Sequence, residues 1–361
     1  MGIEKIDANF SLKEKIATDD AVVYDIPSEK FSLHGIFYDE NNKTFMRMDG
    51  DVAKSVSENV YVLSKRLAGG RLRFATDSTF IRLAVTYEDF CLMSHMPLTG
   101  SSGFSLFEET ENGEVFVKSI APVSSEKKGF TQSVALAGGK MRQYTLYFPL
   151  YNEVLSLSLA FEKGSKVEKG KPYRDVAPIL YYGSSITQGG CASRPDNSYQ
   201  ALICKRNHID FINLGFSGNA KGEDEMVDYL ATIDCSLFVC DYDHNAPTVE
   251  HLQNTHYRLY ERYRAKRPTT PIIFITKPDY VDNEDCKMRQ KIIRSTYLKA
   301  KRKGDNNVYF ISGQSFYGKK NRWDFSVDGC HPTDYGFAVM ADKIYKKMAQ
   351  ISDVFKGEKD D

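Results

Sequence analysis

Three short segments, far apart in the chain, carry the residue types that nucleophilic acyl transfer requires. The first, Tyr182–Gly189 (YGSSITQG), places Ser185 among glycines, and the second, Asn213–Asn219 (NLGFSGN), is also glycine-rich. The third, Asp328–Pro332 (DGCHP), holds an Asp and a His three residues apart. Acyl transfer needs a hydroxyl, a base, a group that orients the base and donors for the developing oxyanion. With a further amide donor at Asn245, the sequence predicts a serine esterase.

The elements that must position these segments alternate between buried strands and helices. Apolar runs, as expected of strands buried on both faces, occur at Pro178–Tyr182, Phe211–Leu214, Leu237–Cys240, Pro271–Thr276 and Val308–Ile311. Helix-length stretches lie between or after them, at Val249–Arg267, Asp282–Lys303 and, following a proline, Thr333–Ile351. This alternation predicts a parallel sheet covered by helices on both faces.

The candidate residues all fall at one edge of that predicted sheet. Ser185, Gly218 and Asn245 each follow a different predicted strand, and Asp328 and His331 lie beyond the last one. Ligands of parallel α/β sheets collect beyond the carboxyl ends of the strands. The shared edge therefore favours one joint site for these residues.

Each residue taken alone also has a simpler explanation. Ser185 could be a turn or helix-cap serine, His331 could start a helix, and Asp328 could cap a turn. Their joint placement favours the catalytic interpretation over these. The serine segment is not a Gly-x-Ser-x-Gly elbow, which disfavours the α/β-hydrolase fold.

The first 165 residues have a different pattern, with many short β-type runs separated by turn residues. The runs are Arg71–Thr76, Phe80–Tyr87, Glu114–Lys118, Gln143–Phe148 and Val154–Phe161. They predict an all-β sandwich, with one short helix across Val56–Leu67. Residues 163–175 are charged and carry Gly and Pro, which indicates a linker. We therefore expect a sandwich domain at 1–165 and an α/β domain at 175–355.

The C-terminal half resembles the SGNH branch of the GDSL-type lipase/acylhydrolases, which are flavodoxin-like α/β esterases. The resemblance implies that Ser185 is the nucleophile, His331 the general base and Asp328 the orienting acid. It also implies that the Ser185 and Gly218 N–H groups and the Asn245 amide form the oxyanion hole.

Two departures from the family pattern stand near these residues. Ser184 takes the place of the name-giving aspartate, and the usual Gly-x-Asn-Asp becomes Asp243–Ala246 (DHNA). The block Gly-Ser-Ser-Ile-Thr-Gln-Gly is similar to that of a subgroup in which an N-terminal, jelly-roll-like β-sandwich precedes the esterase domain. Tyr147–Glu153 resembles the final strand region of that sandwich.

A metal site has weaker support in the sequence than the serine esterase site. Asp241, Asp243 and His244 could suggest a metal, as could His331 with Asp334, but no His-Glu-x-x-His or comparable cluster occurs. We expect no metal and no cofactor.

Four other residues stand out by type, and we assign none of them a catalytic role. His251 and His256 are expected on a solvated helix face, and Cys330 is expected to be a packing thiol. Trp323 is expected either to line an acyl or sugar pocket or to lie in the core.

Composition limits the partners. Lys plus Arg and Asp plus Glu are 48 each among 361 residues, so charge gives no case for nucleic acid or an anionic membrane. No run approaches 18 apolar residues, and Met1–Asp7 lacks the features of a signal peptide. Seven cysteines without framework spacing suggest free thiols. We expect a cytoplasmic protein, although an exported protein without its signal would look the same, and the sequence does not predict the oligomeric state.

The expected substrate is a small-molecule or oligosaccharide ester, most simply an O-acetylated carbohydrate. Polar residues in the predicted loops, among them Asn197, Tyr199 and Asp243, favour a small acyl group on a polar alcohol. A lipid esterase or thioesterase is the alternative, and a binding protein with a vestigial site is a third. Because the base must be neutral, activity should rise as the pH passes about 6–7.

Overall fold

The computed structural model describes residues 15–123, 128–278, 283–318 and 320–357, and the chain forms two compact units. The sandwich unit takes the described residues up to Arg47, together with Lys65–Pro172 and Ser193–Asp196. The α/β unit takes Met48–Ser64, Tyr173–Ala192 and the described residues from Asn197 onward. A short segment from the N-terminal half of the sequence therefore folds with the C-terminal half.

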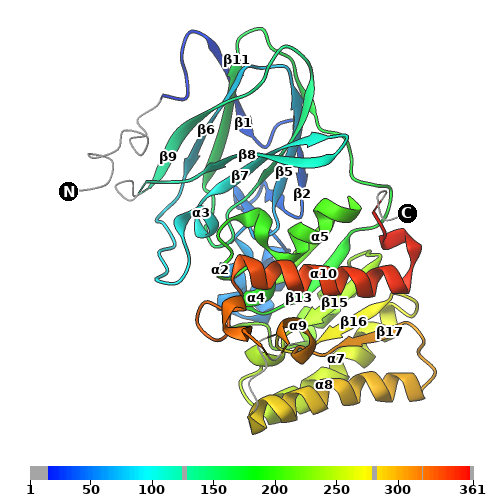
Figure 1. Ribbon diagram of the computed structural model, residues 1–361. Coiled ribbons are helices and arrows are strands. Elements are labelled where there is room, and N and C mark those ends of the chain that lie inside the picture. The colour runs from blue at the N-terminus through cyan, green and yellow to red at the C-terminus, as the bar shows by residue number, and fades with distance from the viewer. Residues whose placement is uncertain (1–14, 124–127, 279–282, 319, 358–361) are drawn as a thin grey trace. The chain divides into compact units, whose positions relative to one another are not determined.

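Two antiparallel sheets make up most of the sandwich unit (Figure 1). The first has the order β1 (Ala21–Ile26), β11 (Ser156–Glu162), β6 (Phe80–Thr86) and β9 (Gly129–Ala135). The second has the order β12 (Val167–Lys169), β5 (Arg71–Thr76), β10 (Arg142–Tyr147), β7 (Phe104–Thr110) and β8 (Gly113–Ile120), with β2 (Ser32–His34) paired to β5. A small hairpin of β3 (Phe37–Asp39) and β4 (Thr44–Met46) and the short helix α3 (Leu98–Ser101) complete the unit.

Alternate residues of both sheets fill one core in this unit. Leu83 on β6 and Leu159 on β11 belong to the same buried cluster as Leu72 on β5 and Leu146 on β10. In a half-buried strand, every second side chain faces the core. The predicted all-β sandwich is confirmed.

The short helix predicted across Val56–Leu67 is confirmed as α2 (Glu58–Ser64), and a second helix that was not predicted, α1 (Gly50–Val56), precedes it. Ser57 between them is extended, with φ −174° and ψ 159°, and its Oγ accepts from the Val60 N–H at 3.2 Å. A serine that caps the next helix from an extended conformation interrupts the first one.

The α/β unit is built on five parallel strands in the order β14 (Phe211–Gly215), β13 (Ile179–Gly183), β15 (Leu237–Asp241), β16 (Ile272–Ile275) and β17 (Val308–Ile311). In sequence order this is 2-1-3-4-5, the flavodoxin-like arrangement. The predicted fold class is therefore confirmed. In the sheet register, Gly183 lies opposite Gly215 on one side and Asp241 on the other.

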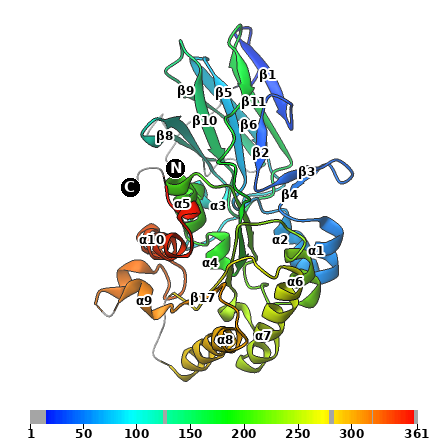
Figure 2. The same cartoon turned by 90° about the vertical axis from the view of Figure 1, so that its right-hand side faces the viewer.

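Helices cover both faces of this sheet (Figure 2). On one face, Leu180 and Tyr182 share a core with α1, α2, α6, α7 and α8. On the other, the Tyr181 ring contacts Tyr199, which stacks on Phe337. The helices are α4 (Ser185–Gln188), α5 (Tyr199–Asn207), α6 (Asp224–Leu230), α7 (Val249–Lys266), α8 (Glu284–Arg302), α9 (Gln314–Tyr317) and α10 (Asp334–Ile351), with 3-10 turns η3 (Pro195–Asn197), η4 (Asp243–Asn245), η5 (Arg322–Phe325) and η6 (Asp353–Phe355).

Some sequence predictions concern residues outside the described part of the chain. They are Asp282, at the start of one predicted helix, and the first 14 residues, which include the segment judged for a signal peptide. Among the helices that the structure describes, none is both long and apolar enough to cross a membrane. All seven cysteines are free thiols, four of them buried.

Candidate active site

Ser185 lies where β13 turns sharply into α4. Gly183 has no room for a side chain, because a Cβ atom there would lie 2.1 Å from the carbonyl oxygen of Asp241. The Ser184 N–H donates to that same oxygen at 3.0 Å, and the Ser184 Oγ accepts from the Ile186 N–H at 3.2 Å. Ser184, which replaces the name-giving aspartate, is therefore the N-cap of the helix that carries Ser185.

A chain of hydrogen bonds runs from Ser185 to Asp328. Ser185 Oγ lies 2.8 Å from His331 Nε2, and His331 Nδ1 lies 2.7 Å from Asp328 Oδ2. The structure thus brings together the three residues that the sequence singled out. A hydroxyl, an imidazole that can remove its proton and a carboxylate that holds the imidazole are the parts of a catalytic triad.

The loop that carries Asp328 and His331 is closed on itself. The Val327 N–H donates to the His331 carbonyl at 2.8 Å, and Gly329 sits at φ +80°, a conformation that favours glycine. Thr333 then caps α10 by accepting from the Gly336 N–H at 3.2 Å. The tight turn explains how residues only three apart direct their side chains at each other.

The carboxylate of Asp328 is held in its charged form. Partial burial raises its pKa, but hydrogen bonds from the His331 and Cys330 N–H groups and from the His331 ring outweigh this and lower the pKa to about 2. The two backbone bonds to Oδ1 measure 2.8 Å and 2.9 Å. Asp328 can therefore stabilise a positive charge that forms on the imidazole.

Gly218 and Asn245, the predicted oxyanion donors, lie after β14 and β15, the two strands that flank β13. Gly218 has φ +69° in a turn where the Asn219 N–H donates to the Phe216 carbonyl at 2.9 Å. The Asn245 Oδ1 accepts from the Ala220 N–H at 3.4 Å. Within the described residues the Asn245 Nδ2 has no hydrogen bond, so this donor remains available to a substrate. Their roles in an oxyanion hole stay a prediction.

Buried amide side chains support this edge of the sheet, and the sequence interpretation gave them no role. Gln188 Oε1 accepts from the Ser217 N–H at 2.9 Å, which fixes the residue before Gly218. Asn213 Nδ2 donates to the Thr187 carbonyl at 2.8 Å. Both are amides within the motif segments, and Asn213 lies inside an otherwise apolar strand. This pattern could have revealed them.

Three possible metal-ligating residues lie together at the carboxyl end of β15. The donor atoms of Asp241, Asp243 and His244 are within 4.8 Å of one another. Asp243 already bonds to His244 Nδ1 and to the Lys277 N–H, both at 2.8 Å. Burial raises the pKa of Asp241 to about 7, so this carboxyl is partly protonated at neutral pH. The expectation that the protein needs no metal stays a prediction.

The prediction that His256 lies on a solvated face is wrong. His256 is buried on α7, where its Nδ1 lies 2.9 Å from Thr296 Oγ1 and its ring stacks on Tyr242. Burial lowers its pKa to about 3, so it is neutral. The reason is position, because His256 follows Leu252 by one helical turn on the face that packs against the sheet.

Trp323 is 62% exposed in η5, which excludes the core alternative for it. His251 is half-buried, and its Nε2 lies 2.8 Å from the Lys221 carbonyl. Cys330 is half-buried beside His331.

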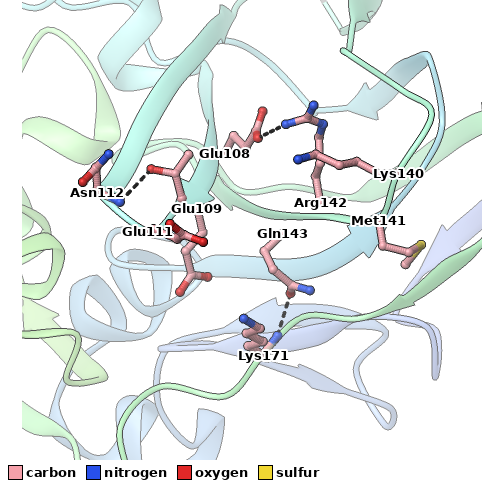
Figure 3. Close-up of a pocket in the computed structure, with 10 residues that line it drawn as sticks. Glu108, Glu109, Glu111, Asn112, Lys140, Met141, Arg142, Gln143 and Lys171 are labelled. Carbon is pink, nitrogen blue, oxygen red and sulfur yellow. Dashed lines mark hydrogen bonds and ion pairs between the residues drawn. The ribbon is translucent and has the colours of Figure 1, made fainter.

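A separate pocket of about 610 Å³ lies in the sandwich unit, at the β7–β8 turn and β10 (Figure 3). Hydrogen bonds join residues of its lining. Arg142 donates to Glu108 at 2.6 Å, and the Lys171 N–H donates to Gln143 Oε1 at 2.9 Å. None of its lining residues belongs to the predicted triad.

A serine, a histidine and an aspartate linked in this way at the carboxyl edge of a flavodoxin-like sheet define a serine hydrolase. Residues 176–349 match the family model of the GDSL-like Lipase/Acylhydrolase family, and residues 22–167 match that of the N-terminus of Esterase_SGNH_hydro-type proteins. Residues 176–349 form a domain of the GDSL-like lipase/acylhydrolase family, and the protein is a serine ester hydrolase.

Solved structures share this two-part architecture. A protein of Bacteroides ovatus described as a GDSL-like lipase is 27% identical, with a TM-score of 0.82 over 91% of this chain and 98% of that one. The salicylyl-acyltransferase SsfX3 from a tetracycline biosynthetic pathway is 16% identical, with a TM-score of 0.73 over 93% and 98%. An acetyl xylan esterase from the rumen bacterium Butyrivibrio proteoclasticus is 12% identical, with a TM-score of 0.61 over 94% and 100%. The last two share the fold. No match was found among curated proteins.

Proposed function

We propose that this protein removes a short acyl group, most simply acetyl, from a carbohydrate ester through an acyl-enzyme. The observation that carries the chemistry is the hydrogen-bond chain from Ser185 through His331 to Asp328, with links of 2.8 Å and 2.7 Å. The substrate class rests on weaker support. It comes from the fold shared with an acetyl xylan esterase and from the polar character of the loop residues in the catalytic half of the sequence, such as Asn197.

In the proposed reaction, His331 Nε2 takes the Ser185 hydroxyl proton as Oγ bonds to the ester carbonyl carbon. The carbonyl oxygen becomes an oxyanion, and the imidazolium is stabilised by Asp328. Collapse breaks the bond to the sugar oxygen, which leaves with the proton from His331. Water, deprotonated by the same imidazole, then attacks the acyl carbon. The bond from that carbon to Ser185 Oγ breaks, Oγ takes the proton back from His331, and the carboxylic acid is released.

The oxyanion would be stabilised by the Ser185 and Gly218 N–H groups and by Asn245 Nδ2. Such donors act because they are already oriented before the charge develops. The hydrogen bonds that fix the Ser217 N–H and the Asn245 Oδ1 limit the reorientation that these donors need.

The experiment is hydrolysis of p-nitrophenyl esters from acetate to decanoate, with Ser185→Ala as the control. A sharp preference for acetate that vanishes in the control supports a deacetylase, and release of acetate from acetylated xylo-oligosaccharides would then test the alcohol. A rate that holds or rises with chain length would instead assign the protein to esters or thioesters of longer acyl chains. Adding a concentrated sugar acceptor distinguishes hydrolysis from acyl transfer, because transfer yields a new ester instead of free acid.

A further inference from the structure

One guanidinium nitrogen of Arg289, on α8, bridges two backbone carbonyls that flank Asn245 in the sequence. This nitrogen, Nη1, donates to the Asp243 carbonyl at 2.5 Å and to the Ala246 carbonyl at 2.9 Å. These acceptors lie two residues before and one residue after Asn245. We propose that Arg289 is a positioning residue that holds Asn245 in place to donate to the oxyanion. The inference rests on the proposed function, in which Asn245 is such a donor.

Arg289 is itself held rigidly. Its side chain is only 11% exposed, and its Nε donates to Asp285 Oδ2 at 2.7 Å, one turn earlier on α8. A guanidinium is planar and permanently charged, so its bonds to carbonyl oxygens are directional and charge-assisted. Arg289 is therefore a hydrogen-bond donor held in a fixed position beside the loop, and not a mobile side chain.

The loop needs such a restraint because it is not fully packed. It borders a cavity of about 130 Å³, whose lining includes Asp243, His244 and Arg289. Among the residues that the structure describes, the side-chain oxygen of Asn245 accepts one long hydrogen bond, of 3.4 Å, from the Ala220 N–H. Without Arg289, the carbonyls at 243 and 246 would lose their charged partner and the loop could shift into this space.

The consequence is specific to the transition state. Removing an oxyanion donor typically lowers turnover on the order of 10²–10³-fold, and misplacing a catalytic group by about 1 Å can cost about 10²-fold. Loss of the Arg289 contacts should therefore reduce the rate of the step that forms the oxyanion, and should leave ground-state binding nearly unchanged.

A double-mutant cycle tests this with a fluorophosphonate as the probe, because its P=O oxygen occupies the oxyanion hole whatever the natural ester is. The readout is the rate of Ser185 phosphonylation in wild type, Arg289→Met, Asn245→Ala and the double variant. We expect Arg289→Met to slow labelling by about 10- to 100-fold in the wild-type background and by less than about 3-fold beside Asn245→Ala. Arg289→Lys, which keeps the charge, should recover part of the rate.

Arg294→Met is the matched control, since Arg294 is exposed on the same helix and should label at the wild-type rate. An equal loss from Arg289→Met in both backgrounds, or no loss in either, overturns the inference. So does an Asn245→Ala variant that labels normally. If Arg289→Met fails to fold by circular dichroism, the cycle is run with Arg289→Lys, judged by the same coupling. A wild-type protein that is labelled but does not cleave acetyl esters would sink the proposed substrate and leave this test intact.

Discussion

Ser185 and His331 are 146 residues apart in the chain, and Ser185 Oγ lies 2.8 Å from His331 Nε2. One residue begins the helix that follows the first strand of the parallel sheet, and the other lies in the turn before the last long helix, α10. Only the parallel topology, which gathers loops at one edge, brings them together.

Replacing Asp328 with Asn should lower kcat on p-nitrophenyl acetate by about 10²- to 10⁴-fold with little change in KM. An amide cannot stabilise the imidazolium and favours the wrong imidazole tautomer. The steady-state kinetics of the folded variant measure this. A loss below about 3-fold would show that the carboxylate does not act through His331.

The pH dependence of Asp328 has a definite sign. Because its pKa is lowered to about 2, from 3.8, its charged form is favoured by folding. The stability it contributes is present above about pH 4 and is lost as the pH falls towards 2. Activity lost between pH 7 and 4 should therefore not reflect protonation of Asp328. NMR titration of the Asp328 carboxyl measures this, and a midpoint between pH 4 and pH 7 would contradict it.

Asn245→Ala should lower kcat on p-nitrophenyl acetate by about 10²- to 10³-fold, because it removes a fixed donor to the oxyanion. Asn245→Asp is the matched variant, since it keeps the size but replaces the donor with an acceptor. It should be at least as slow as the alanine variant. If either variant keeps more than about a third of the wild-type rate, Asn245 is not a donor in the reaction.

Asp241→Asn should change how stability depends on pH. Burial raises the pKa of Asp241 from 3.8 to about 7, so the folded state binds a proton that the unfolded state releases at lower pH. The wild-type protein should therefore lose stability relative to the variant as the pH rises from about 4 to about 7, by at most about 4 kcal/mol. Urea unfolding of both proteins at pH 5 and pH 8 measures the difference. An equal gap at the two pH values would contradict the buried, partly protonated carboxyl.

The strands were readable from the sequence because parallel strands covered on both faces are apolar runs, whereas many sandwich strands alternate apolar and polar residues. The apolar run Val308–Ile311 matches β17, and the alternating run Arg71–Thr76 matches β5. Once the strands were placed, the loops that follow their carboxyl ends could be assigned to one edge of the sheet.

Other features depend on contacts that the sequence pattern does not contain. The helix predicted across Val56–Leu67 begins only at Glu58, because the Ser57 Oγ caps it by accepting from the Val60 N–H. Met48–Ser64 folds with the α/β unit through residues such as Val60, whose buried partners come from the other half of the chain. Arg289 acts on the Asn245 loop across a separation of more than 40 residues, and a charged residue on a helix most often faces solvent.

The most direct test of the account is covalent labelling with a fluorophosphonate, followed by mass spectrometry of the peptides. We expect one phosphonyl group per chain, on Ser185, with labelling lost in Ser185→Ala and slowed in Asp328→Asn. Labelling of another residue, or none in a folded wild-type protein, would contradict the assignment of Ser185 as the nucleophile.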